Sequence, residues 1–303
     1  MKKIVTATFG AFLVATLTQS AGAEELDGTL AKIDETALIR VGHRESAIPF
    51  SYLDDNQKPI GYSLELCAHI VDTVKRKLGR DDIEFAYVPV TSQTRIPLMV
   101  NGVIDLECGS TTNNLERQTQ VSYAPTMFVA AGRLLVKKSS GIKEVADLKG
   151  KVVAANQGSN PVRVLGEMNQ SRNIGLTMGP SKDFAESFLL LETDRVSAVA
   201  QDDILLAGLK ANARNPEDYE IVGEPYTVEP YGIMLRKGDP QFKELADEAM
   251  KAMMADGTFA AIYEKWFQNP IPPRNVNLNL PMSPELQKVV ANPTDSGDPA
   301  NYR

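Results

Sequence analysis

The sequence predicts an α/β protein with two lobes, the second of which is inserted into the first. Two separate stretches, residues 38–108 and 152–209, alternate strand patterns with helix patterns. Such alternation is typical of a parallel sheet covered by helices. Two extended apolar segments, residues 126–136 and 225–235, connect these stretches, so we expect the chain to cross between two bodies twice.

The first stretch predicts strand, helix, strand, helix and strand in that order. Residues 38–43 alternate apolar and polar side chains, as a strand does. Apolar residues recur at helical spacing over 64–78, with Ser63 as the expected N-cap and Gly79 at the helix end. The remaining expected elements are strands at 83–90 and 103–108 and a short helix at 95–100.

The second stretch repeats this organisation. A strand at 152–155 precedes a helix that Ser159 or Asn160 can cap, and a helix at 185–192 precedes a strand at 196–200. Three further helices are expected at 240–255, 258–267 and 283–290. We expect one lobe from residues 24–130 with 229–303, and the inserted lobe from 131–228. Ligands should bind between the lobes, near the carboxyl ends of the strands.

The first 23 residues have the layout of a secretory signal peptide. Lys2 and Lys3 precede a mostly apolar run over 4–17, and Ala21-Gly22-Ala23 is a small-residue cleavage pattern. A membrane anchor is the alternative, but the run is shorter than the roughly 20 residues that span a bilayer. We therefore expect cleavage after Ala23 and a secreted, periplasmic protein.

The charge of the remaining 280 residues limits the partners. Removal of Lys2 and Lys3 leaves 30 basic residues against 39 acidic ones, a net charge of −9. This balance argues against nucleic acid as a partner. His43 and His69 are the only histidines, so no His-rich metal site is expected, and no motif indicates a cofactor. The two cysteines, Cys67 and Cys108, either form one disulfide or remain buried thiols.

Several motifs resemble the amino-acid-binding proteins of ABC transporters, and most closely their glutamate/aspartate-binding branch. The motifs are Val41-Gly-His-Arg-Glu-Ser, Thr91-Ser-Gln-Thr-Arg-Ile-Pro-Leu, Asp105-Leu-Glu-Cys-Gly-Ser-Thr-Thr-Asn-Asn-Leu-Glu-Arg, Gln201-Asp-Asp-Ile-Leu-Leu-Ala-Gly and Lys265-Trp-Phe-Gln-Asn-Pro-Ile-Pro-Pro. The resemblance implies the two-lobed type II periplasmic-binding-protein fold, with a two-stranded hinge. It also implies a monomer that delivers L-glutamate or L-aspartate to membrane subunits of an importer.

A free amino acid needs an anchor for each charged group. Arg117 can offer two parallel N–H groups to the α-carboxylate, and Ser110 and Thr112 lie in the loop before it. Asp202, at a strand end, is the candidate partner of the α-ammonium group. The resemblance assigns these residues the same roles. We expect Arg117 to lie on the helix that follows the third strand.

Arg44, Ser92 and Arg95 are the candidates for binding the ligand's side chain. They follow expected strands of the first lobe, and in the resembled branch these positions surround a side-chain carboxylate. A zwitterion is neutralised by Arg117 and Asp202 alone. Two further arginines would be left unpaired by a neutral ligand, which is costly in a closed cleft.

Two positions depart from the branch. Phe184 stands where a histidine usually reaches the ligand, and Asn160 replaces a small hydroxyl residue. Phe184 can still close the cleft as an apolar wall. Ser159 and Asn160 remain candidate donors because free N–H groups point outward at a helix N-terminus. These departures leave glutamine, asparagine or a broader range of amino acids open as ligands.

A further alternative is an enzyme on the same scaffold, similar to a cyclohexadienyl dehydratase. Such an enzyme needs a positioned general acid or base. Glu45 and Glu107 are the only nominees near the expected cleft, and a structural role is favoured for each. We therefore expect a binding protein without catalytic residues.

Overall fold

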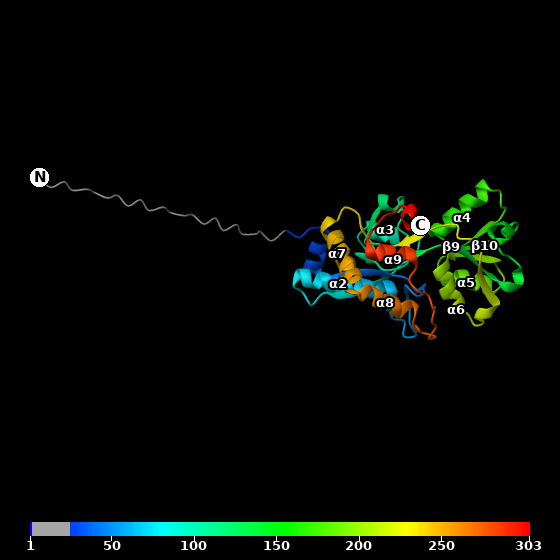
Figure 1. The fold of residues 1–303 in the computed structure, drawn as a ribbon, viewed down its shortest axis with the longest axis horizontal. Helices are drawn as coiled ribbons and strands as arrows, with labels where there is room; N and C mark the ends of the chain where they lie inside the picture. Colours follow the sequence, from blue (N-terminus) through cyan, green and yellow to red (C-terminus); the bar gives the residue numbers. More distant parts are fainter. Residues whose placement is uncertain (2–24) are drawn as a thin grey trace.

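The computed structural model describes Met1 and residues 25–303, which fold into two α/β lobes side by side (Figure 1). The predicted signal peptide lies outside the described residues. No helix of the described part is both long and apolar enough to cross a membrane. The predicted fold class is confirmed, because each lobe has a central mixed sheet flanked by helices.

The first lobe is built on a five-stranded sheet in the order β5-β1-β6-β15-β7. β1 runs parallel to β5 and β6, whereas β15 returns antiparallel between β6 and β7. A small sheet of β2, β3 and β4 lies beside it. The strands are β1 (Leu38–His43), β2 (Ser46–Ala47), β3 (Ser51–Leu53), β4 (Pro59–Ile60), β5 (Glu84–Pro89), β6 (Leu106–Glu107), β7 (Val121–Tyr123) and β15 (Met234–Arg236).

Six helices belong to the first lobe. α2 and α7 are amphipathic and pack against each other, with α1, α8 and α9 adding to α7. This is why the C-terminal segment returns to the lobe in which the chain began. The helices are α1 (Gly28–Thr36), α2 (Tyr62–Leu78), α3 (Arg95–Val100), α7 (Pro240–Asp256), α8 (Thr258–Phe267) and α9 (Pro284–Ala291).

The second lobe has a sheet of matching order, β11-β10-β12-β9-β13. β10 runs parallel to β11 and β12, and β9 is antiparallel to β12 and β13. The parallel strands therefore end at one edge, where their connections begin. The elements are β9 (Gly132–Lys137), β10 (Val152–Asn156), α4 (Asn160–Ser171), β11 (Thr177–Ser181), α5 (Phe184–Glu192), β12 (Ala198–Asp202), α6 (Asp203–Ala211) and β13 (Tyr219–Val222).

Two antiparallel strands, β8 (Phe128–Ala130) and β14 (Glu229–Tyr231), connect the lobes. Phe128 and Tyr231 belong to a buried aromatic cluster with Phe50 and Phe267 of the first lobe, with ring centroids 5.1–6.0 Å apart. Aromatic pairs at such separations add to the stability gained from burial. The connecting strands are therefore anchored in the first lobe.

Most expected elements are present, but several local predictions were wrong. Ser63 does not cap α2, which begins at Tyr62 after Gly61, and the Ser63 hydroxyl donates to the Gly109 carbonyl instead. Residues 126–136 form two strands rather than one. The third expected strand is only the two-residue β6, and α1 has no counterpart among the expected elements.

The two cysteines form a disulfide between α2 and the end of β6. Cys67 and Cys108 are both buried, and they close a loop across 41 residues of sequence. The bond therefore fastens the principal helix of the first lobe to the sheet edge that carries the loop at residues 109–117.

The disulfide should stabilise the first lobe by reducing the entropy of the unfolded chain. For a loop of this length, we expect Cys67→Ala/Cys108→Ala to lower the free energy of unfolding by about 3–4 kcal/mol. Denaturant unfolding of the double variant, compared with oxidised and reduced wild-type protein, measures this. Equal stability of all three samples would contradict the prediction.

Candidate functional site

All ten predicted site residues lie just beyond, or at, the carboxyl ends of parallel strands. In the first lobe, Arg44 follows β1, Ser92 and Arg95 follow β5, and Ser110, Thr112 and Arg117 follow β6. In the second lobe, Ser159 and Asn160 follow β10, Phe184 follows β11, and Asp202 ends β12. All ten are buried. The sheet topology therefore places these residues at facing edges of the two lobes.

Arg44 and Phe184 meet across the two lobes. The guanidinium carbon of Arg44 lies 4.5 Å from the centroid of the Phe184 ring, a cation–π contact. Arg44 is only 1% exposed, and its two terminal nitrogens have no hydrogen-bond partner among the described residues. Burial, and next the charge of Arg95, lower the pKa of Arg44 to about 9. The group thus stays charged at neutral pH, with two donors available for an anion.

Arg95 is held beside this position by the loop after β6. Its Nη1 donates to the Thr111 hydroxyl at 2.5 Å, and Thr111 donates to the carboxylate of Glu107. Burial and the charge of Arg117 lower the pKa of Arg95, while Glu107 opposes that shift. Glu107 therefore offsets part of the positive charge of the Arg44–Arg95 pair, and the pair retains a net attraction for anions.

Arg117 connects the lobes through backbone carbonyls. Its Nη1 donates to the Thr112 carbonyl at 2.8 Å, and its Nη2 donates to the Gly158 carbonyl of the second lobe at 3.0 Å. Arg117 begins a 3₁₀ turn of three residues, so the expected helix here was wrong. The Asn114 side chain accepts the backbone N–H of Arg117, and such local bonds compete with helix formation.

The lobes touch closely beside Arg117. Gly158 has φ +80°, and a Cβ there would lie 2.8 Å from the Ser92 carbonyl oxygen, so glycine is required. Asn156, at the end of β10, donates to the Ser92 hydroxyl at 3.2 Å. The buried hydroxyls of Ser110 and Ser159 have no partner among the described residues. Because buried polar groups are nearly always hydrogen-bonded, these hydroxyls are suited to a polar ligand.

Asp202, at the end of β12, supplies a negative charge to the site, whereas Arg44 supplies a positive one. Its Oδ1 has no hydrogen-bond partner among the described residues. Burial is the largest cause that raises the pKa of Asp202, and the charge of Glu229 raises it further. A cation beside both carboxylates would relieve this repulsion.

Glu229 and Glu107 are the residues whose place in the site the sequence did not reveal. Glu229 is fully buried on β14, where it accepts hydrogen bonds from Thr112 and Asn160. Its position in an otherwise extended apolar crossing was the available signal, because a carboxylate in such a segment must find partners when buried. Glu107 was expected near the cleft with a structural role, but its action on Arg44 and Arg95 was not predicted.

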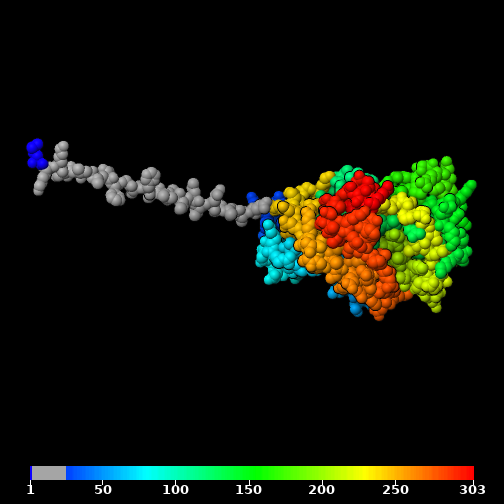
Figure 2. All heavy atoms as spheres, in the orientation of Figure 1, coloured from blue at the N-terminus to red at the C-terminus, as the bar shows by residue number. Residues whose placement is uncertain are grey.

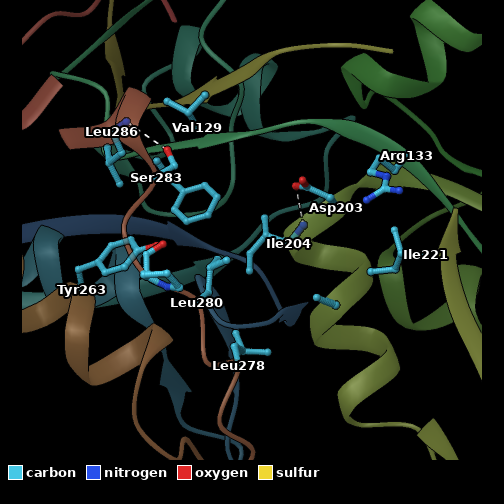
Figure 3. Close-up of a pocket in the computed structure, with 13 residues that line it drawn as sticks. Val129, Arg133, Asp203, Ile204, Ile221, Tyr263, Leu278, Leu280, Ser283 and Leu286 are labelled. Atoms are coloured by element: carbon cyan, nitrogen blue, oxygen red, sulfur yellow. Dashed lines mark hydrogen bonds between the residues drawn. The ribbon is translucent and has the colours of Figure 1, made fainter. Parts of the chain in front are cut away.

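A separate cavity of about 310 Å³ lies between the first lobe's C-terminal segment and α6 (Figure 3). Its lining is mostly apolar, and Ile204 of α6 points toward Leu280 of the C-terminal segment in the view. Among the described residues that line it, none is one of the ten predicted site residues. Its charged lining residues are Arg133 and Asp203, and both bond to the backbone: Arg133 donates to the Gly223 carbonyl, and Asp203 accepts from the N–H groups of Ala131 and Ile204.

Two α/β lobes connected by two strands, with charged side chains facing one another from the strand ends, define a two-lobed solute-binding protein. The comparison with protein families agrees. The chain belongs to the bacterial extracellular solute-binding proteins, family 3, whose family model matches residues 39–269.

Curated relatives are similar to this chain in sequence, and solved structures are similar to it in fold. The chain is 48% identical to the L-glutamate/L-aspartate-binding protein of Pseudomonas aeruginosa, covering 94% of this chain and 95% of that protein. It is 44% identical to the glutamate/aspartate import solute-binding protein of Escherichia coli, covering 97% and 98%. An ancestral arginine-binding protein bound to arginine has a TM-score of 0.68 and 32% identity, covering 76% of this chain and 98% of that chain.

The raised pKa of Asp202 predicts how pH affects the ligand-free protein. A carboxyl group whose pKa is raised by folding makes the folded protein less stable as pH rises from the group's unfolded pKa through its folded pKa. We therefore expect Asp202→Asn to be more stable than wild-type protein at pH 8 and equally stable at pH 3.5. Denaturant unfolding at both pH values measures the difference, and a variant that is less stable at pH 8 would contradict the assignment.

Proposed function

We propose that this chain binds an acidic L-amino acid, glutamate or aspartate, and delivers it to the membrane subunits of an ABC importer. The observation that carries the proposal is the buried Arg44–Arg95 pair, because the Arg44 fork offers two donors that no described residue accepts. Arg117 and Asp202 face the same space from the other end. The two relatives named for glutamate and aspartate support the same ligand class.

In this proposal the ligand lies with its side-chain carboxylate at Arg44, Ser92, Arg95 and Ser110. Its α-carboxylate accepts hydrogen bonds from Arg117 and Ser159, beside Thr112, whose hydroxyl donates to Glu229. Its ammonium group binds Asp202. Phe184 covers the Arg44 guanidinium, which fixes the plane of the fork. A planar fork that is held in place loses less entropy when it binds a carboxylate.

Glutamine or asparagine is the second candidate ligand, because Glu107 already offsets one of the two arginine charges.

No catalytic role is proposed. We further propose cleavage after Ala23, a monomeric periplasmic protein, and lobe boundaries at residues 130/131 and 228/229, where β8 and β14 act as the hinge.

Calorimetric titration of refolded, ligand-free protein tests the ligand class. We expect glutamate and aspartate to bind at least 100-fold more tightly than glutamine and asparagine, because the amides leave buried guanidinium donors poorly paired. Arg44→Met keeps the apolar stem against Phe184 and should remove most of this preference. Equal affinity of wild-type protein for acids and amides would reject the acidic ligand class.

Closure of the lobes predicts the effect of a substitution away from the ligand. A Cβ on Gly208 of α6 would lie 2.5 Å from the Ile48 carbonyl oxygen in the first lobe. We expect Gly208→Ala to preserve the fold, since alanine favours helices, and to weaken ligand binding at least tenfold by obstructing closure. Scattering should also show less compaction on ligand addition.

The matched control is Gly166→Ala in α4, where an added Cβ meets nothing within 4 Å. This variant should bind as wild-type protein does. If Gly208→Ala binds and compacts like the control, the lobe contact seen at Ile48 is not required for binding.

A further inference from the structure

Glu229 makes more contacts within the site than its place in a connecting strand suggests. Its side chain is fully buried, and each carboxylate oxygen accepts one hydrogen bond. Thr112 Oγ1 donates to Oε2 at 2.5 Å, and Asn160 Nδ2 donates to Oε1 at 2.8 Å. The hydroxyl belongs to the loop before Arg117, and the amide belongs to the first residue of α4. One carboxylate therefore joins the two lobes.

The bond from Asn160 to Glu229 depends on closure, because Glu229 is fixed to the first lobe. The next residue, Pro230, accepts the backbone N–H of Asn113 at 2.7 Å. Tyr231 follows, with its ring 5.1 Å from that of Phe50 in the aromatic cluster. Asn160 moves with α4 of the second lobe. Separation of the lobes therefore breaks the Asn160 bond and leaves the Thr112 bond intact.

The charge of Glu229 also acts on the site. Its charge raises the pKa of Asp202, second to the effect of burial. The charge of Arg117 opposes that rise, but its terminal nitrogens donate to the carbonyls of Thr112 and Gly158. An alkylammonium group has three N–H donors, and its single charge suits a position between two carboxylates.

We propose that Glu229 is a second carboxylate for the ligand's α-ammonium group, and that its bonds to Thr112 and Asn160 latch the lobes around that group. This deepens the proposed function and rests on it. The latch also gives Asn160 a role, because its amide reaches the hinge carboxylate from the first residue of α4. Recognition of the amine and closure are then carried by the same side chain.

The test compares amino acids with analogues that lack only the α-amino group. Glutamate and glutarate are titrated against wild-type protein, Glu229→Gln and Asn160→Ala. Glu229→Gln should weaken the binding of glutamate much more than that of glutarate. The Kd of glutarate divided by the Kd of glutamate should therefore fall at least tenfold. Asn160→Ala should weaken the binding of both ligands by a similar factor, about fivefold, because it removes the bond that latches the lobes and keeps the charge of Glu229.

Glu224→Gln is the matched control, since Glu224 is an exposed glutamate just before the crossing segment that carries Glu229. It should leave both affinities unchanged. If Glu229→Gln does not fold, Glu229→Asp replaces it. That variant keeps the charge but shortens the side chain, so it should preserve the preference for glutamate over glutarate while weakening both.

Two results would overturn the proposal. A Glu229→Gln variant with the wild-type Kd ratio would show that the carboxylate does not act on the ammonium group. An Asn160→Ala variant with wild-type affinities would show that the latch does not contribute to binding.

Failure of the proposed ligand class is distinct, because wild-type protein is titrated first. If glutamine binds instead, glutaramate replaces glutarate and the comparison stands; if none of the four amino acids binds, both proposals fail.

Discussion

The cost of burying charge is the constraint on which the rest of this structure depends. Six charged side chains are buried where the two lobes meet, three cationic and three anionic: Arg44, Arg95, Arg117, Glu107, Asp202 and Glu229. An unpaired buried ion costs several kcal/mol, so each must be close to an opposite charge or a set of hydrogen bonds. The protein meets this requirement unevenly. The like charges of Arg44 and Arg95 act on each other, and so do those of Asp202 and Glu229. That polarity is what an amino acid with an anionic side chain fits.

The fold supplies this polarity through strand direction rather than through any single motif. Parallel strands of both sheets end facing each other, so six separate connections deliver their polar residues to one space. The aromatic cluster fixes β8 and β14 to the first lobe, which leaves the second lobe as the body that moves. Figure 2 shows the C-terminal residues lying over the first lobe and reaching the junction with the second. There Arg274 donates to the Ala213 carbonyl at 3.0 Å, a further contact between the lobes.

Local sequence was enough to predict the two-lobed fold, because strand alternation and helical periodicity are strong over 38–108 and 152–209. The ten candidate site residues came from the motifs and the family resemblance together, and the structure brings them to strand ends. It could not predict Glu229, whose partners lie 117 and 69 residues away in sequence, since such contacts leave no local pattern. The helix expected at Arg117 was wrong for a different reason. The Asn114 side chain binds the backbone there, and periodicity alone does not register that competition.

The central claim is that opposite ends of the site bind opposite ends of the ligand. A crystal structure of the protein with glutamate tests this most directly. The account predicts the side-chain carboxylate within hydrogen-bond distance of both terminal nitrogens of Arg44, and the ammonium group beside Asp202. A glutamate molecule bound in the reverse direction, with its ammonium group near Phe184, or bound outside the lobe interface, would contradict it.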